Sequence, residues 1–261
     1  MTGLRPTGAE AKSKRAAGAG GDFITMSLAE NIARVRANIA AAAQAVGREA
    51  SEITLVAATK TQTSQTIREA IAAGITVCGE NRVQEMTAHL EDNAYQGAGL
   101  HFIGHLQTNK VKYVVGRVDL IESVGSQRLL EAIEAQAAKR GLVQDILLEV
   151  NIGGEESKSG IPPEEVPALA ALAGAAPHLR LRGLMAIPPV AGTPGANLPF
   201  FAQMEQLFVD IRTNMGHNRS DINCLSMGMS GDYEDAVRAG ATLVRVGTAL
   251  FGPRPPMKSK R

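Results

Sequence analysis

The sequence predicts an α/β protein, a single (β/α)8 TIM-type barrel with an extra N-terminal helix. Eight short apolar runs alternate with amphipathic stretches along the chain, and strands that alternate with helices form a parallel sheet. Eight is also the number of strands that closes such a sheet into a barrel. An open doubly wound sheet is the alternative, but no Gly-x-Gly-x-x-Gly turn follows any of the apolar runs.

The first expected element is a helix over residues 27–47. Ser27-Leu-Ala-Glu30 has the form of a capping box, in which the two polar side chains satisfy amides of the first turn. Gly47 can end the helix. The apolar residues at helical spacing between them are Leu28, Ile32, Val35, Ile39 and Val46. The chain stops soon after the eighth apolar run, so we expect this helix to cover the barrel where a final helix would lie.

The remaining elements follow in alternation. Strands are expected at 53–59, 75–79, 100–104, 119–123, 145–151, 181–187, 222–227 and 242–246. Helical patterns lie between them, at roughly 64–73, 82–92, 108–116, 126–140, 163–174, 198–214 and 232–239. The barrel is therefore expected to occupy residues 27–256.

The two ends of the chain differ from this pattern. Residues 1–26 are rich in Gly, Ala, Lys and Arg and have little apolar periodicity, which predicts a disordered leader. Arg and Ser with few acids also fit a transit peptide weakly, and Met26 is a candidate initiator. Residues 257–261 are expected to be a disordered tail.

Composition excludes several classes of partner. The net charge of +1 and the 3% aromatic content argue against nucleic acid. No apolar run approaches the length of a membrane helix. Cys78 and Cys224 each lie in an apolar run, so we expect buried free thiols and a cytoplasmic protein. A monomer is expected.

The barrel model brings three strand ends together. Active sites of this fold form at the C-terminal ends of the strands, and phosphates often bind after strands seven and eight. Lys60 ends the first strand, which neighbours the eighth in a closed barrel. Glycines and hydroxyls that can approach a phosphate follow the last two strands. The candidates there are Ser226, Met227, Gly228 and Ser230, then Gly247 and Thr248.

A lysine beside such turns suits an aldehyde that carries a phosphate. Pyridoxal 5'-phosphate is such an aldehyde, and lysine forms Schiff bases with it. We therefore predict this cofactor, bound covalently to Lys60. The plain alternatives are a solvated lysine and ordinary helix-start chemistry in the two turns.

Arg245 lies inside the eighth strand pattern, on the same face as Leu243 and Gly247. A buried guanidinium needs a partner, which is either a neighbouring acid or the pyridine nitrogen of the cofactor. A permanently charged arginine would keep that nitrogen unprotonated and weaken the ring as an electron sink.

Other polar groups are expected at the same rim. Asn81 either bonds the ring hydroxyl or caps the next helix, and His105 is a candidate acid or base. Gln107 lies nearby, and the charged loop 155–160 is either a lid or simply solvated. Met185, near the end of the sixth strand, either packs against the ring or belongs to the core.

Several segments together resemble the pyridoxal phosphate homeostasis protein family. They are Ala58-Thr-Lys60, Gly79-Glu-Asn-Arg82, His101-Phe-Ile-Gly-His-Leu-Gln-Thr-Asn-Lys110, Leu225-Ser-Met-Gly-Met-Ser-Gly-Asp232 and Arg245-Val-Gly-Thr-Ala-Leu-Phe-Gly252.

The resemblance covers about residues 28 to 254. It implies a barrel similar to the N-terminal domain of alanine racemase, with a Schiff base at Lys60, phosphate contacts from Ser226, Gly247 and Thr248, and Arg245 near the ring nitrogen. It also implies a role in vitamin B6 and amino-acid homeostasis, without established catalysis. Transient contacts with pyridoxal phosphate-dependent apoenzymes are a separate expectation.

Two other functions stay open. A racemase needs an acid–base group on each face of the cofactor, and in the alanine racemase architecture the group opposite the lysine is a tyrosine. Among Tyr95, Tyr113 and Tyr233, only Tyr233 is near the predicted rim. A barrel that binds another phosphorylated metabolite would lose little affinity without Lys60.

Overall fold

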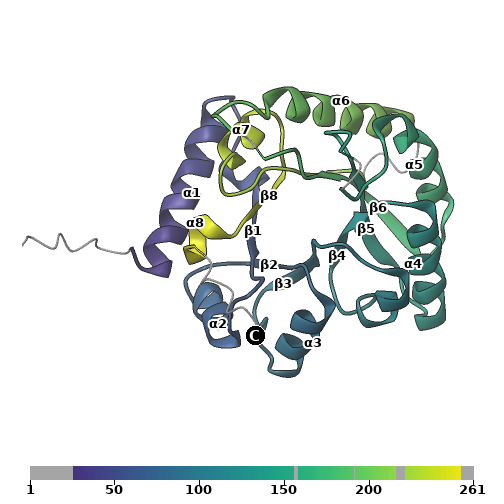
Figure 1. The fold of residues 1–261 in the computed structure, drawn as a ribbon, viewed down its shortest axis with the longest axis horizontal. Helices are drawn as coiled ribbons and strands as arrows, with labels where there is room; N and C mark the ends of the chain where they lie inside the picture. Colours follow the sequence, from purple (N-terminus) through teal and green to yellow (C-terminus); the bar gives the residue numbers. More distant parts are fainter. Residues whose placement is uncertain (1–25, 156–157, 191, 216–220, 254–261) are drawn as a thin grey trace, which may run out of the picture.

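The computed structural model describes residues 26–155, 158–190, 192–215 and 221–253. These residues form a closed barrel of eight parallel strands in the order β1 to β8, with β8 paired to β1 (Figure 1). The predicted (β/α)8 barrel is therefore confirmed. The expected leader lies almost wholly, and the expected tail wholly, outside the described residues.

Each predicted strand is present within a few residues of its expected bounds. The strands are β1 Thr54–Ala58, β2 Val77–Glu80, β3 Gly99–Phe102, β4 Leu120–Val124, β5 Gln144–Val150, β6 Leu179–Ala186, β7 Cys224–Ser226 and β8 Leu243–Val246.

The helices surround the barrel. They are α1 Leu28–Gln44, α2 Ser64–Ala72, α3 Val83–Glu91, α4 Gln127–Arg140, α5 Val166–Ala175, α6 Leu198–Asn214, α7 Tyr233–Arg238 and α8 Thr248–Phe251. The described residues also form three short 3-10 helices, η1 Ala50–Glu52, η2 Thr108–Tyr113 and η3 Pro163–Glu165. The segment expected as a helix at 108–116 is thus a 3-10 helix, whose three-residue turn suits the spacing of Val111 and Val114.

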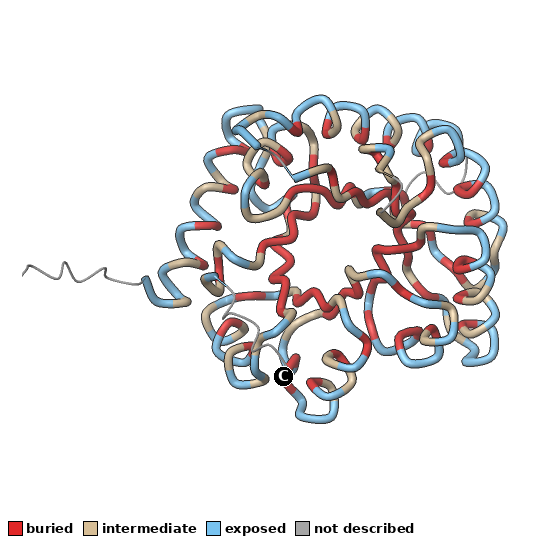
Figure 2. Tube along the Cα trace, in the orientation of Figure 1, coloured by how far each residue is buried: buried red, intermediate tan, exposed pale blue. Residues whose placement is uncertain are grey.

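The core has two layers. The larger lies between the strands and the helices, and Figure 2 shows the resulting ring of buried strands inside helices that expose their outer faces. A smaller cluster fills the barrel interior. Its buried members are Val56, Leu120, Leu147, Met185 and Leu243.

The N-terminal helix α1 covers the seam between the two ends of the barrel. Its capping box is formed as predicted, with Ser27 and Glu30 each bonding the other's backbone amide. The helix packs against α2, α7 and α8, and Asn31 donates to the Leu250 carbonyl at 3.0 Å. The expectation that α1 covers the barrel where a final helix would lie is confirmed, although the short helix α8 lies beside it.

The two cysteines are free thiols, as expected. Cys78 is buried, but Cys224 is only half-buried, so the prediction of two buried thiols is wrong for Cys224. It borders a cavity at the N-terminal end of the strands, beside His101 and Arg182. In the part of the chain that is described, no helix has the length and apolar character needed to cross a membrane.

Candidate functional site

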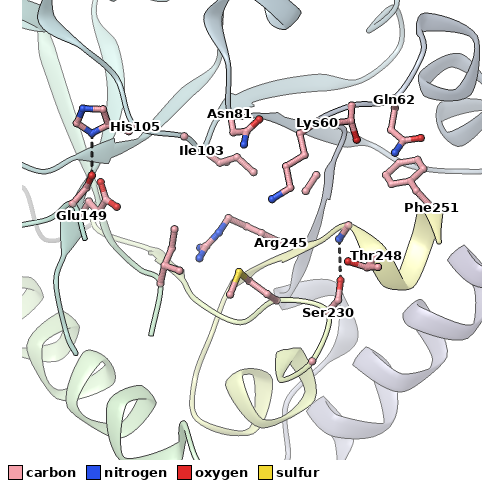
Figure 3. A pocket seen from close by; sticks show the side chains of 18 of the residues that line it. Lys60, Gln62, Asn81, Ile103, His105, Glu149, Ser230, Arg245, Thr248 and Phe251 are labelled. Atoms are coloured by element: carbon pink, nitrogen blue, oxygen red, sulfur yellow. Dashed lines mark hydrogen bonds between the residues drawn. The ribbon is translucent and has the colours of Figure 1, made fainter. Parts of the chain in front are cut away.

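A cavity of about 540 Å³ opens at the C-terminal ends of the strands. Its wall includes residues from the turns after β1, β2, β3, β6, β7 and β8, and residues within β1, β5 and β8. Figure 3 shows the side chains that meet there. Five of the predicted site residues line it together, namely Lys60, Asn81, Arg245, Gly247 and Thr248.

Lys60 extends from the end of β1 into this cavity, toward the space that Arg245 also faces (Figure 3). The residue before it, Thr59, is buried and donates to Glu80 Oε1 at 2.6 Å. The residue after it, Thr61, has a φ of 66°, and its amide donates to Glu85 Oε2 at 3.0 Å. A β-branched residue rarely adopts this conformation, so strain is concentrated next to the lysine.

Two backbone amides after β8 converge on a hydroxyl of the turn after β7, and we call this arrangement the amide cradle. Ser230 Oγ accepts hydrogen bonds from the amides of Gly247 at 3.1 Å and Ala249 at 3.2 Å. Gly231 and Thr248 line the cavity on either side. Amides that converge on one oxygen, next to hydroxyls, are the arrangement that binds phosphate oxygens.

Arg245 is held inside the barrel by a chain of hydrogen bonds. Its guanidinium donates to Ser226 Oγ and to the Ala186 carbonyl, the latter at 2.8 Å. Ser226 Oγ in turn donates to Glu122 Oε2 at 2.6 Å, and that carboxylate lies 3.8 Å from the guanidinium. The acid partner predicted as one alternative for Arg245 is therefore present. Arg245 also lines the cavity, and its contact with a pyridine nitrogen stays a prediction.

This chain of hydrogen bonds continues from Glu122 toward the N-terminal end of the barrel interior. His101 Nδ1 lies 2.7 Å from Glu122 Oε1. Burial on its own would raise the pKa of Glu122, but His101, Arg245 and Ser226 outweigh burial and lower this pKa. Glu122 is thus a buried carboxylate that balances the charge of Arg245.

Asn81 follows β2 and lines the cavity. The structure does not use it as a helix cap, because the residue at that position of α3 is Arg82, without a side-chain cap. Among the described residues, Asn81 Oδ1 has no hydrogen-bond partner although it is buried. Gly104 permits this arrangement, since a Cβ there would lie 2.2 Å from the Asn81 carbonyl oxygen.

Glu149, on β5, also lines the cavity. Its side chain is buried, and within the described part of the chain its Oε2 has no hydrogen-bond partner. Burial raises the pKa of Glu149 to about 7, although Arg245 opposes this shift. The cavity therefore contains an acid that is poised to gain or lose a proton near neutral pH.

Four predicted residues are not on the cavity wall. Met185, Ser226 and Met227 are fully buried, and Met185 belongs to the inner core cluster. Gly228 has a φ of 92°, and a Cβ there would lie 2.5 Å from the Cβ of Ala236, so this glycine allows α7 to pack. Their contacts with a cofactor remain predictions, and the geometry places Ser230 closer to that role than Ser226.

The other polar candidates line either this cavity or the one that adjoins it. His105 and Lys158 line the cavity, whereas Gln107 lies in an adjoining one. His105 Nδ1 is 2.9 Å from Ser159 Oγ. Lys158 is paired with Glu155 and donates to the Pro188 carbonyl at 3.1 Å, so the described part of the loop after β5 is tied to the rim.

Sequence reasoning missed Glu122 and Glu149. Each is an acid inside an otherwise apolar strand pattern, Leu120-Ile-Glu122 and Leu147-Leu-Glu149. A buried acid requires a partner or a shifted pKa, and that was the signal available. The residues that face each acid are on other strands, so its setting becomes visible only in the folded barrel.

Comparison with known proteins agrees with this geometry. The family model described as "Alanine racemase, N-terminal domain" matches residues 31–255. The pyridoxal phosphate homeostasis protein of Aquifex aeolicus is 41% identical over 88% of this chain and 99% of that protein. The protein of the same name from Escherichia coli K12 is 40% identical over 87% of this chain and 97% of its own length.

The chain belongs to the pyridoxal phosphate homeostasis protein family.

Solved structures extend this assignment to the fold. The structure of PipY from Synechococcus elongatus with PLP bound is 32% identical, has a TM-score of 0.75, and the match covers 87% of this chain and 100% of PipY. Alanine racemase from Streptomyces coelicolor is 21% identical with a TM-score of 0.65, over 86% of this chain and 59% of the racemase. The racemase shares the barrel alone, whereas the homeostasis family shares both barrel and sequence.

Proposed function

We propose that this chain binds pyridoxal 5'-phosphate (PLP) as a Schiff base on Lys60 and takes part in intracellular PLP and amino-acid homeostasis. The observation that carries the proposal is the composition of one cavity wall, where Lys60, Arg245 and the amide cradle around Ser230 line the same space. The PLP-bound structure of the related PipY and the names of the curated relatives support the same ligand.

The described residues fit three of the functional groups of this cofactor, namely its phosphate, its aldehyde and its ring hydroxyl. The cradle after β7 and β8 suits the phosphate, and the lysine amine suits the aldehyde. Asn81 Oδ1 is a buried acceptor without a partner among the described residues, which suits a ligand hydroxyl. When bound, PLP would supply a reactive aldehyde and an electron-withdrawing ring.

Each residue has a separate task in this proposal. Lys60, in its neutral form, would supply the amine nitrogen that replaces the aldehyde oxygen, which would leave as water. Arg245 would donate an N–H to the ring nitrogen and, being permanently charged, would keep a proton off that atom. Glu122 and Ser226 hold the guanidinium in place. A ring nitrogen without a proton is a weaker electron sink, which suits holding the cofactor better than transaminating with it.

The finer features of the role are also proposals. We expect the chain to act in the cytoplasm, where free thiols such as Cys78 persist. We expect it to act as a monomer, because the groups assigned to PLP lie on one chain. Contacts with PLP-dependent apoenzymes would then be transient.

Absorbance spectroscopy with Lys60→Ala tests the proposal. Wild-type protein mixed with PLP is expected to give a Schiff-base band, and borohydride followed by peptide mass analysis should place the pyridoxyl group on Lys60. The variant should lose both signals while keeping the wild-type circular dichroism spectrum. Label spread over surface lysines such as Lys139 would contradict the site and leave a phosphate-binding barrel.

A PLP-dependent amino-acid racemase is the second candidate. It is favoured by Glu149 and His105, two acid–base groups that line the cavity with Lys60. It is disfavoured by the tyrosines, because Tyr95, Tyr113 and Tyr233 are not among the lining residues. Exchange of the α-proton of L-alanine in D₂O distinguishes the two roles, since a carrier should give no exchange above that of free PLP.

A further inference from the structure

A second cavity of about 440 Å³ adjoins the first at the ends of β3, β4 and β5. The two share a wall made by His105, Glu149 and Ser159. Lys60 and Arg245 line only the first cavity, and the turn that enters α4 lines only the second. A molecule in the second cavity would therefore lie beside the lysine and not on it.

Two buried polar atoms of residues that line the second cavity lack partners among the described residues. Ser123 and Glu149 are 2% and 6% exposed, and neither Ser123 Oγ nor Glu149 Oε2 has a hydrogen-bond partner among the described residues. A Cβ added at Gly125 would lie 3.4 Å from Glu149 Oε2, which places this oxygen next to a residue of the second cavity. Unpaired buried polar groups destabilise a protein, so a ligand that pairs with them gains affinity.

The opposite side of the cavity is positive. It is formed by the first turn of α4, a helix of 14 residues. Ser126 caps it by accepting from the Leu129 amide at 3.2 Å, and its first turn contains no acidic residue. The remaining first-turn amides and the helix dipole attract anions, and Arg128 lines the same cavity.

We propose that this second cavity is a non-covalent site for a small zwitterionic α-amino acid, with the ammonium group at Glu149 and Ser123 and the carboxylate at Arg128 and the start of α4. The reason is charge complementarity, because one wall holds an unpaired acid and the other a helix N-terminus and an arginine. A ligand with a carboxylate but no amine would leave Glu149 without a positively charged partner from the ligand. An amine without a carboxylate would leave the positive wall unmatched.

The ammonium group would also stabilise Glu149 itself. Burial raises the pKa of this carboxyl to about 7, and an adjacent cation favours the ionised form. The site lies against the cavity assigned to PLP, so an amino acid bound there would contact the wall that both ligands share. Occupancy of one cavity would then affect the other through Glu149, His105 and Ser159.

Calorimetry on protein whose lysine has been blocked tests this proposal. PLP is attached to Lys60 with borohydride, so that no aldehyde remains to react with an amine. L-alanine is then titrated, with acetate and ethylamine as ligands that carry only one of its two charges. L-alanine should bind, and each of the others should bind at least about tenfold more weakly, as expected from the loss of one charge-assisted hydrogen bond.

Variants locate the site. Arg128→Ala and Ser123→Ala should each weaken L-alanine binding about five- to tenfold. Lys139→Ala, which removes an exposed cation from the last turn of the same helix, should leave binding unchanged. Ser123→Ala deletes a hydroxyl that has no partner in the described structure, so the fold should persist, as checked by thermal melting.

The outcomes separate this inference from the proposed function. If borohydride does not attach PLP to Lys60, the PLP proposal fails, and L-alanine is titrated into the untreated protein instead. In either preparation, no binding of L-alanine would overturn the inference. Equal binding of acetate, or wild-type affinity in both Arg128→Ala and Ser123→Ala, would overturn it as well.

Discussion

At the residue scale, the barrel interior contains buried carboxylates in contrasting settings. Glu122 is surrounded by donors and has a lowered pKa. Glu149 faces a cavity with one oxygen unpaired, and burial raises its pKa to about 7. The same side chain thus serves as a fixed charge on β4 and as a titratable group on β5.

Glu149→Gln should change how stability depends on pH. The pKa of Glu149 is about 7 in the folded protein, against an ordinary value of 4.5. The folded protein holds this proton more tightly, so the contribution of Glu149 to stability is fully present below pH 4.5 and is lost as the pH rises through about 7. The loss is about 3 kcal/mol at most.

Urea unfolding at about pH 5 and about pH 8.5 measures this difference. Glu149→Gln should match the wild type at the lower pH and be more stable at the higher one. Glu91→Gln, at the exposed end of α3, is the control and should show no such trend. A constant difference between variant and wild type at both pH values would exclude a raised pKa at Glu149.

Glu122→Gln should destabilise the fold by about 3 kcal/mol, because it leaves the buried Arg245 without its counter-charge. The matched control is Glu134→Gln. Glu134 Oε1 lies 2.8 Å from His178 Nδ1, so the contact resembles that of Glu122 with His101, but it is partly exposed. Its loss should cost less than about 1 kcal/mol. Equal losses in chemical denaturation would mean that Glu122 does not balance Arg245.

These residues also show where sequence reasoning stops. Lys60, Gly247 and Thr248 could be placed because each follows a strand, and the ends of parallel strands meet at one rim. Ser226 was assigned to the phosphate because it also ends a strand. In the structure its hydroxyl bonds Glu122, a residue 104 positions away in the chain, and such a partner is fixed by the barrel and not by local sequence. A contact between Ser226 and the phosphate stays a prediction.

At the scale of elements, the sequence predicts structure well where a few neighbouring residues determine it. The capping box of α1 is complete within four residues, and it forms as expected. The segment at 108–116 was harder, because its few valines fit a helical turn of either type. The structure has a 3-10 helix from Thr108 to Tyr113, and a repeat this short does not separate three residues per turn from 3.6.

Ser27→Ala should reduce stability by about 1 kcal/mol, because the hydroxyl is the acceptor for the Glu30 amide. The change lies in a helix that packs on α2, α7 and α8, so thermal melting of the whole barrel should report it. Ser51→Ala, at an exposed serine in η1, serves as the comparison and should melt like the wild type. Identical melting of the two variants would show that the cap contributes nothing.

At the scale of the whole molecule, closure of the barrel bears on whether the protein associates with other chains. Each described strand has a neighbour on both sides, so no strand of the barrel offers a free edge for pairing with another chain. The groups assigned to PLP also come from a single chain. Light scattering after gel filtration should therefore give the mass of one chain, 27.4 kDa, and a mass near twice that value would contradict the expectation of a monomer.

The contact between α1 and α8 has a consequence for the order in which the protein is made. Asn31 bonds the carbonyl of Leu250, 219 residues later, so the first helix leaves the ribosome long before its partner exists. The part of α1 that packs on α7 and α8 stays uncovered until those helices have been synthesised, whereas its neighbour α2 is made soon after it. Closure of β1 on β8 completes the amide cradle in the same event. A nascent chain that stalls before Leu243 would leave part of α1 exposed and would have no cradle, and exposed apolar surface makes an incomplete chain prone to aggregation.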